Sequence, residues 1–411
     1  MFISHNALCW IEKLKKLSYK TLSIYKKDQN MWYFTEEENA LREVAKDFAT
    51  KELAPFAEKH DHDETFNINA FKKMGELGIL GITADPKYGG AGLGATAATI
   101  VMEEFGKVCA GSTLSYLAHS MLCVNNISTN ASEAQKEMYL PKLISGEHIG
   151  AMGMSEPGYG SDAVGMQCRA KLEGDHYIIN GNKMWITNAQ YADIVYLYTR
   201  TGAEKKNLST FIIDTKKTEG YSVSKEIHKM GMRSSPTGEL SFENSKVPVS
   251  QRVGAEGDSV KHMMRNLEIE RLTIAGISLG IAQACVDQCL KYANEREQFG
   301  KTLGKFQMIQ KMIAEMASET EMMRHFLYNI CKEWDAGKVS NTAASMVKLQ
   351  LPKMATKIAL DAIQIHGGYG YSREFPLERM MRDNKLNEIG AGTNEVMIMI
   401  IAKNLLKEAQ L

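Results

Sequence analysis

The sequence predicts an α+β protein with an N-terminal helical domain, a middle antiparallel β domain and a C-terminal helical domain. Apolar side chains recur at helical spacing before about residue 145 and again after about residue 256. Between these stretches lie short runs of β-branched and aromatic residues, separated by turn residues. The chain has 411 residues, 44% of them hydrophobic, which is enough for two to three domains with a sizeable core.

The expected divisions are an extension of uncertain role at 1–30 and domains at 31–147, 148–255 and 256–411. The extension carries six lysines against one glutamate and one aspartate. A mitochondrial presequence is one interpretation, although such segments are rich in arginine and this one has none. The other interpretation is an upstream extension ahead of a start at Met31.

The first predicted helix begins after Thr35, which can cap it, and three glutamates follow in its first turn. A second helix is expected over 68–78, followed by the strand-like or turn segment I-L-G-I-T-A. The Gly-rich stretch 89–94 lacks the βαβ context of a dinucleotide fingerprint, so we expect a loop there before a helix at 95–108. Further helix should reach about residue 145.

Five apolar runs in the middle of the chain predict the antiparallel strands of a sandwich or barrel. They read I-G-A-M-G-M, H-Y-I-I-N-G, D-I-V-Y-L-Y-T, S-T-F-I-I-D and G-E-L-S-F-E-N. Turns are expected at Gly181-Asn182 and Glu219-Gly220. The helical spacing of the C-terminal part is seen in Leu272, Ala275, Leu279 and Ala282.

Charge and composition exclude several classes of function. Forty-nine basic residues balance forty-nine acidic ones, so no overall field favours nucleic acid or an anionic membrane. The seven cysteines form no C-x-x-C pair, so no metal site is expected, and free thiols indicate a reducing compartment. No run of eighteen apolar residues is present, which predicts a soluble protein without a transmembrane segment.

The stretch from His366 to Val396 says most about function. It reads H-G-G-Y-G-Y-S-R-E-F-P-L-E-R-M-M-R-D-N-K-L-N-E-I-G-A-G-T-N-E-V. Its Gly-Gly turn, R-D-x-K segment and G-A-G-T loop resemble the C-terminal signature of the acyl-CoA dehydrogenases. Y-G-G-A-G-L-G, L-S-Y-L-A-H-S and S-E-P-G-Y-G-S-D resemble the same family, and the resemblance covers essentially all of 34–408. It implies a C-terminal four-helix bundle, FAD as cofactor and α,β-desaturation of an acyl-CoA.

In most members of this family the loop carries a glutamate that acts as the catalytic base, and Ala391 occupies that position here. The resemblance to members that act on branched acyl groups places the base at Glu270, directly before Arg271. An apolar pocket would raise its pKa toward neutrality. From L-E-I-E-R-L alone, Glu270 could equally be an exposed carboxylate paired with a cation. Glu268 is the main competitor for the base, but it lies about 200° away on a helix, so the two carboxylates cannot both face one α-carbon. The resemblance gives Glu268 a place beside the substrate, and Arg271 would lie there too or anchor the helix and its neighbouring carboxylates.

The resemblance implies that the backbone N–H of Ala391 binds the thioester oxygen, which needs preorganised donors. Gly390 replaces a tyrosine of many straight-chain members and would leave room for a branch near the β-carbon. Backbone torsion is the other explanation for Gly390, and also for Gly392. Leu114 and Ala118 match the floor of a short acyl pocket, although plain helix packing explains either residue.

Two further residues are expected near the CoA arm. Ser161, in G-Y-G-S-D, would contact it, although a turn-forming serine fits the same segment. Lys261 departs from the aromatic residue of the resembled enzymes and could bind a phosphate.

The resemblance also implies which residues hold FAD. Trp185 would stack on the flavin ring, unless it is a core residue of its strand, and Thr187 would present its hydroxyl to the N5 edge. Arg296 would supply charge to phosphate, and the Gly-Gly pair at 367–368 is either an approach for phosphate or a simple turn. The expected FAD-binding residues are Met152, Met154, Ser155, Trp185, Thr187, Arg296, Phe299, Gln307, Gln364, Gly367, Gly368, Thr393 and Glu395.

The expected function is FAD-dependent desaturation of a short branched acyl-CoA, isovaleryl-CoA above all, with electrons passed to electron-transferring flavoprotein. Because part of the family's FAD site comes from a neighbouring subunit, a homotetramer is expected. The alternatives are a short-chain or 2-methyl-branched specificity, or a non-catalytic acyl-CoA-binding homologue. The protein would lie in the cytoplasm of a bacterium or in the mitochondrial matrix of a eukaryote.

Overall fold

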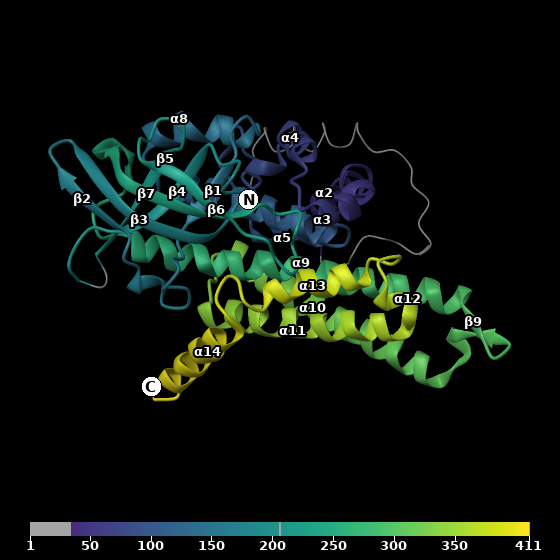
Figure 1. The fold of residues 1–411 in the computed structure, drawn as a ribbon. Coiled ribbons are helices and arrows are strands. Elements are labelled where there is room, and N and C mark those ends of the chain that lie inside the picture. Colours follow the sequence, from purple (N-terminus) through teal and green to yellow (C-terminus); the bar gives the residue numbers. More distant parts are fainter. Residues whose placement is uncertain (1–33, 205–206, 411) are drawn as a thin grey trace.

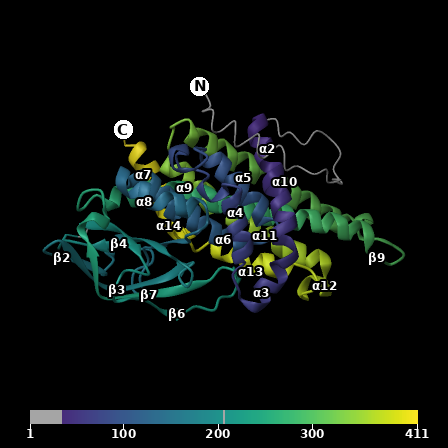
Figure 2. The same ribbon diagram turned by 90° about the horizontal axis from the view of Figure 1, so that it is seen from above.

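The computed structural model describes residues 34–204 and 207–410 and consists of three parts that meet along one long helix, α9 (Ser259–Glu295). The β domain and the N-terminal helices lie on one side of α9, and the remaining C-terminal helices lie on the other (Figure 1). A view from above shows the β domain at one end of the molecule and β9 at the opposite end (Figure 2). The expected extension at 1–30 lies outside the described residues.

The N-terminal part is helical, as expected. Thr35 caps the first helix, and a capping box joins it to Glu38. The segment after Gly78 forms a 3₁₀ turn, Ile79–Gly81, rather than a strand. Two π-helical turns, Ala49–Leu53 and Ala118–Val124, extend neighbouring helices. The helices are α2 (Glu36–Phe48), α3 (Ala57–Asp63), α4 (Ile68–Glu76), α5 (Ala95–Gly106), α6 (Ala110–Leu117), α7 (Asn125–Asn130) and α8 (Glu133–Ile144).

The middle part is one mostly antiparallel sheet with the strand order β6-β7-β3-β2-β4-β5-β8. Strand β4 is the exception, because it pairs in parallel with β1 and with β2. The strands are β1 (Gly150–Gly153), β2 (Arg169–Glu173), β3 (His176–Thr187), β4 (Ile194–Arg200), β5 (Leu208–Asp214), β6 (Tyr221–Glu226), β7 (Thr237–Pro248) and β8 (Arg252–Val253).

The turn expected at Gly181-Asn182 was wrong. Both residues lie inside β3, at a register shift against β7. Gly181 has φ 137°, and a Cβ there would lie 2.7 Å from the Cα of Cys168. The glycine therefore marks a β-bulge with close backbone approach, which gives the same sequence signal as a turn.

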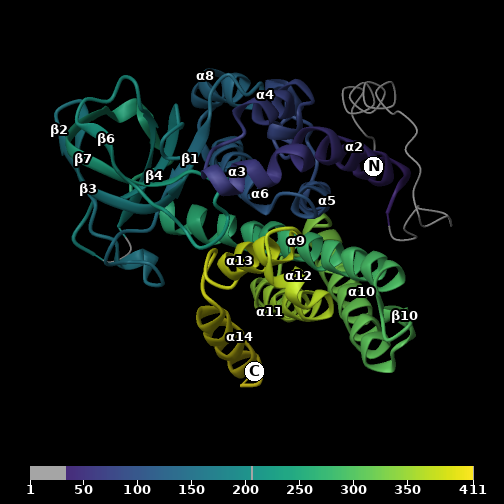
Figure 3. The ribbon, with the colours of Figure 1, turned by 45° about the vertical axis from the view of Figure 1, so that its right-hand side comes forward.

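The C-terminal part confirms the expected helical bundle, in which α9, α10, α11 and α13 pack together. Helix α14 leaves this bundle and projects away from the rest of the molecule (Figures 1 and 3). The elements after α9 are β9 (Glu297–Gln298), β10 (Lys301–Thr302), α10 (Gln307–Asp335), α11 (Asn341–His366), α12 (Gly368–Tyr371), α13 (Leu377–Asn387) and α14 (Asn394–Glu408).

Helix α9 is the central core helix of the molecule. One apolar cluster joins the N-terminal helices to the bundle and includes Phe105, Leu272 and Leu351. Among the described residues, α9 is also the one helix long and apolar enough to cross a membrane, but 94% of its most apolar stretch is buried inside the protein. The burial is that of a core helix.

Candidate active site

Glu270 is a buried carboxylic acid in the first half of α9. Its side chain is 6% exposed, and Oε2 has no hydrogen-bond partner among the residues that the structure describes. Burial raises the pKa of Glu270 to about 7, although the positive charges of Arg271 and Lys348 act in the opposite direction. The alternative of an exposed, paired carboxylate is therefore wrong, and the group has the pKa of a general base that works near neutral pH.

The two charged neighbours of Glu270 on α9 contact a different helix. Glu268 is half-buried, and its Oε1 accepts a hydrogen bond of 2.9 Å from Asn341 Nδ2 on α11. Arg271 is buried, and its Nη1 donates to Ser345 Oγ at 3.4 Å. The α9 segment 268–271 thus lies beside the start of α11, in line with the different directions expected for Glu268 and Glu270.

The loop with Ala391 lies close to Glu270. A Cβ built on Gly390 would lie 3.9 Å from Cδ1 of Ile274, which follows Glu270 by one turn on the same face of α9. Ala391 has φ 56° and Gly392 has φ 94°. These left-handed torsions turn the chain sharply between α13 and α14. The loop therefore packs against α9 one turn from Glu270.

Gly390 and Gly392 differ in what requires the glycine. Gly392 adopts a left-handed torsion, so backbone torsion explains it. Gly390 does not, and the nearest atoms to its added Cβ are the Leu386 carbonyl oxygen at 3.6 Å and Ile274 at 3.9 Å. Torsion therefore does not require this glycine, and among the described residues an added Cβ would meet only ordinary van der Waals contacts.

Leu114 and Ala118 both lie on the N-terminal helices that pack against α9. Leu114 is 7% exposed in α6, and Ala118 is 2% exposed at the start of the π-helical turn Ala118–Val124. Both α6 and this turn contact α9. π-Helical turns often occur at functional sites.

The two β segments expected to bind flavin lie side by side. Lys183 Nζ donates to the Met154 carbonyl oxygen at 3.1 Å, and Met184 N–H donates to the Ser155 carbonyl oxygen at 2.8 Å. Trp185 is 57% exposed and has φ 66°, so it is not the core residue that its strand alone suggested. Thr187 and Met152 are half-buried. A large indole held in a costly torsion on the surface fits a stacking role for a planar ring.

A second group of expected FAD residues lines a pocket of about 540 Å³ at the C-terminal end of α9. Arg296, Gly367 and Gly368 line it, together with Tyr369, whose ring lies 5.5 Å from the Arg296 guanidinium. No atom of the described residues lies within 4 Å of a Cβ added to either glycine. Glu374 also lines this pocket, and the Gly367 N–H already donates to the Gln364 carbonyl oxygen at 3.1 Å. The groups that suit a phosphate are therefore the Arg296 guanidinium and the backbone at Gly368.

The remaining expected residues lie outside that pocket. Phe299 is 92% exposed, and Gln307 and Gln364 are exposed as well. Thr393 caps α14, where its hydroxyl accepts from Val396 N–H at 3.3 Å, and Glu395 is exposed in the first turn. Ser161 and Lys261, expected at the CoA arm, are both exposed.

The two groups of expected FAD residues are far apart within one chain. Glu270 precedes Glu295, the last residue of α9, by 25 positions, which is about 37 Å along a helix. Arg296 follows directly at the far end, whereas the Ala391 loop lies near Glu270. Within one chain, the Arg296 pocket and the Glu270 segment therefore lie at opposite parts of α9.

Sequence reasoning missed three buried polar residues around Glu270. Lys348 on α11 is completely buried, and its Nζ donates a hydrogen bond to the Gly392 carbonyl oxygen. Asn266 lies one turn before Glu270, and neither atom of its side-chain amide has a partner in the described chain. Tyr198 on β4 is buried, and burial, with the Glu270 charge nearby, raises its pKa. A lysine in the apolar run S-M-V-K-L-Q-L was the available signal for Lys348.

Three family descriptions match the chain and together cover most of it. They are the acyl-CoA dehydrogenase N-terminal domain over residues 35–147, the middle domain over 151–245 and the C-terminal domain over 258–406.

Individual proteins agree with this match over nearly the whole length. A mitochondrial isovaleryl-CoA dehydrogenase of Pongo abelii is 43% identical over 393 residues, which are 94% of this chain and 93% of the relative. A mitochondrial 2-methylacyl-CoA dehydrogenase of Solanum tuberosum is 44% identical over 368 residues, 89% of either chain. The structure of butyryl-CoA dehydrogenase from Megasphaera elsdenii superimposes with a TM-score of 0.88 at 36% identity, covering 92% of this chain and 100% of the other.

Proposed function

The chain belongs to the acyl-CoA dehydrogenase family, whose members are FAD-dependent oxidoreductases, and we propose that it desaturates isovaleryl-CoA to 3-methylcrotonyl-CoA. The observation that carries the proposal is Glu270. It is a buried carboxyl with a pKa of about 7, one turn from the residue that packs beside Gly390. The usual loop glutamate of the family is absent here, because Ala391 stands in its place.

In the proposed reaction Glu270 removes the α-proton of the acyl thioester. The unpartnered Oε2 accepts this proton, and the apolar surroundings that raise the pKa make the carboxylate a stronger base than one in water. The thioester oxygen, which becomes more negative as the proton leaves, accepts a hydrogen bond from the Ala391 backbone N–H. A donor fixed beforehand stabilises that charge without reorganisation.

The residues of the β domain fit the flavin of FAD. The exposed indole of Trp185 and the hydroxyl of Thr187 lie on β3, beside the Met152–Ser155 segment. FAD supplies the acceptor for the β-hydride when it is bound. The side chains hold the ring, orient it and keep water away from the α-carbon.

The same cofactor argues for an oligomer. Within one chain, the phosphate-suited pocket at Arg296 is about 37 Å along α9 from Glu270. We propose that a neighbouring subunit supplies the nucleotide half of each FAD site, in a homotetramer. The exposed apolar residues of the projecting α14, including Met399 and Leu406, suit a contact between subunits.

The preference for a short branched acyl group rests on Gly390 and Leu114. Gly390 leaves space next to Ile274, where a branch at the β-carbon would lie, and Leu114 would close the floor of the pocket. A 2-methyl-branched acyl-CoA is the second candidate, since a relative with that printed activity is 44% identical. Electrons would pass to electron-transferring flavoprotein, in the matrix of a mitochondrion or the cytoplasm of a bacterium.

A panel of acyl-CoA substrates tests this function. The purified protein, carrying FAD, is mixed anaerobically with isovaleryl-, 2-methylbutyryl- and butyryl-CoA, and bleaching of the flavin absorbance is followed. We expect isovaleryl-CoA to reduce the flavin fastest. Faster reduction by either competitor would reassign the substrate, and a protein that binds acyl-CoA without bleaching would favour the non-catalytic homologue.

A further inference from the structure

A lysine that is not among the expected site residues contacts the site from the opposite helix. Lys348 on α11 is 0% exposed, and its Nζ donates a hydrogen bond to the carbonyl oxygen of Gly392. An ammonium without water is costly unless other groups compensate for its charge. Burial lowers the pKa of Lys348 to about 8. Among the groups that act against this shift, the Glu270 carboxylate has the largest effect.

The packing of α11 on α9 places Lys348 near Glu270. Asn341 contacts Glu268, and Ser345 contacts Arg271, so the two helices run in the same direction with matching register. Lys348 follows Ser345 by three residues and therefore lies on the same face of α11. On the other side, its bond to Gly392 joins it to the loop whose Gly390 packs beside Ile274 of α9.

We propose that Lys348 is a positioning residue for the catalytic base: its ammonium holds the 390–392 loop in place and keeps the Glu270 carboxylate ionised. The inference rests on the proposed role of Glu270. Lys348 would act through two partners at once, since the same charge that faces the base also fixes the loop with the Ala391 N–H. A hydrogen bond alone would fix the loop, but only a positive charge would act on the base.

The titratable groups around this pair come from α9, α11, β4, α14 and the segment after α13. Arg271 on α9 and Lys348 on α11 face Glu270 with positive charge, and the phenol of Tyr198 on β4 faces it as a neutral group. Lys348 itself is faced by Glu270 and Arg271, by Glu388 after α13 and by Glu395 on α14. Removing the lysine charge leaves Arg271 as the cation acting on Glu270 among these groups, so the pKa of the base should rise further.

Three substitutions separate the two parts of this role. Lys348→Gln keeps a donor for the Gly392 carbonyl but has no charge, Lys348→Arg keeps both, and Lys348→Met has neither. Lys353→Met is the matched control, because Lys353 is an exposed lysine on the same helix. FAD content and far-UV circular dichroism of each variant establish that it is folded.

The experiment measures the rate of anaerobic flavin reduction by isovaleryl-CoA from about pH 6 to about pH 9, a range that spans the titration of the base. In Lys348→Gln and Lys348→Met we expect the apparent pKa to rise by about one unit, with a roughly tenfold slower rate near neutral pH and recovery at high pH. Lys348→Arg and Lys353→Met should keep the wild-type pKa. An unchanged pKa in Lys348→Gln, or a loss of rate equal at every pH, would overturn the proposal.

The proposed substrate and the proposed role of Lys348 can be tested separately. If isovaleryl-CoA does not reduce the wild-type flavin but butyryl-CoA does, the substrate proposal fails, and the same pH series is run with butyryl-CoA. Exchange of the α-hydrogens of the bound thioester with deuterated water, followed by mass spectrometry, reports on Glu270 directly. If Lys348→Met does not bind FAD, the pKa in Lys348→Gln decides the question.

Discussion

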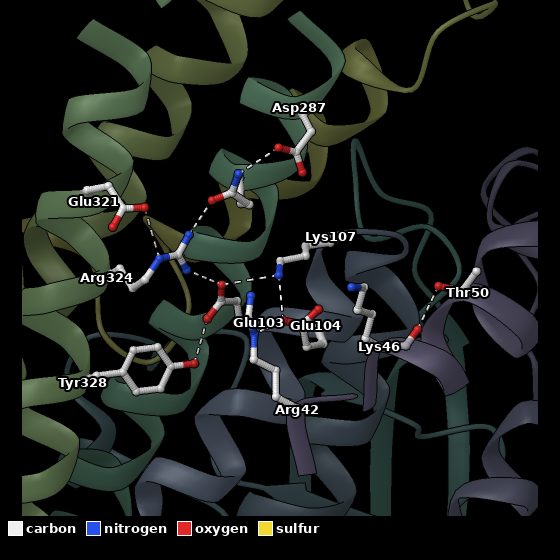
Figure 4. Close-up of polar contacts among 11 residues, drawn as sticks. Arg42, Lys46, Thr50, Glu103, Glu104, Lys107, Asp287, Glu321, Arg324 and Tyr328 are labelled. Carbon is white, nitrogen blue, oxygen red and sulfur yellow. Dashed lines mark hydrogen bonds and ion pairs between the residues drawn. The ribbon is translucent and has the colours of Figure 1, made fainter. Parts of the chain in front are cut away.

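Arg324 on α10 donates a hydrogen bond from Nη1 to Oε1 of Glu103 on α5, and both side chains are buried (Figure 4). The other oxygen of Glu103 accepts from the Tyr328 hydroxyl at 2.7 Å. Burial opposes ionisation of Glu103, but Arg324, Lys107 and Arg42 together hold its pKa at about 2. This network joins the N-terminal helices to the bundle that carries Glu270.

Glu103→Gln should destabilise the protein by about 3–5 kcal/mol, because it removes the buried carboxylate charge that faces Arg324, Lys107 and Arg42. Chemical denaturation at neutral pH measures the change in the free energy of unfolding. Glu321→Gln is the control. Its carboxylate contacts the same Arg324 at 3.4 Å but is 59% exposed, so a loss below about 1 kcal/mol is expected. Equal losses would mean that burial of the pair is unimportant.

The Glu103 network should also make stability depend on acid. The folded-state pKa is lowered from 4.5 to about 2, so the stabilisation is present above the unfolded value and is lost as the pH falls through the folded value. Unfolding followed between about pH 5 and pH 3 should show this loss in the wild type and a weaker slope in Glu103→Gln. Parallel slopes in the two proteins would contradict the assignment.

Glu270 should make stability depend on pH in the opposite direction to Glu103. Its folded-state pKa is raised from 4.5 to about 7, so its contribution is favourable at low pH and is lost as the pH rises through that window. Glu270→Gln should therefore be more stable than the wild type at about pH 8, by up to about 3 kcal/mol, and nearly equal to it at about pH 4. Thermal melting of the two proteins at both pH values measures this difference. A variant that is less stable at the higher pH would contradict the buried acid.

Moving the carboxylate to the loop should restore part of the activity. Ala391 lies on the loop that packs beside Ile274, one turn from Glu270. The double variant Glu270→Ala with Ala391→Glu should regain flavin reduction over Glu270→Ala alone, by at least about tenfold, since general-base catalysis contributes on the order of 100-fold or more. Ile389→Glu in the same background is the control, because Ile389 is 55% exposed. Recovery with either glutamate would indicate a nonspecific effect.

Gly390→Tyr should change selectivity more than folding. Among the described residues, the added Cβ meets no atom closer than 3.6 Å, so the backbone can accept a Cβ, and the ring would then fill the space beside the β-carbon. We expect kcat/KM for isovaleryl-CoA to fall by at least about tenfold, and that for butyryl-CoA to fall less, because excluding a methyl group is worth about 1–3 kcal/mol. An equal fall for both substrates would refute the role of Gly390.

The helix–sheet–helix order could be predicted because it depends on the local spacing of apolar side chains, which can be read directly from the sequence. The segment at Gly181 could not, since a bulge and a turn both require a glycine, and only the closeness of Cys168 distinguishes them. Strand β4 looked like the other strands, and its parallel pairing with β1 is set by tertiary contacts.

At the site, resemblance led to Glu270, but the residues alone left its burial open. Burial depends on what α11 and the loop place over α9, and that packing has no signal in the window around Glu270. Lys348 was missed for the same reason, since its partner Gly392 is 44 positions away in the chain. The residue type of Trp185 also fitted a buried core residue of its strand. Only its torsion and its exposure in the structure exclude that interpretation.

The role of Glu270 is tested most directly by anaerobic mixing of Glu270→Gln, loaded with FAD, with isovaleryl-CoA. The wild type should lose its flavin absorbance within seconds. The variant should bind FAD and the thioester, seen as a perturbed flavin spectrum, yet bleach at least about 100-fold more slowly. Bleaching of Glu270→Gln at the wild-type rate would contradict the assignment of Glu270 as the base.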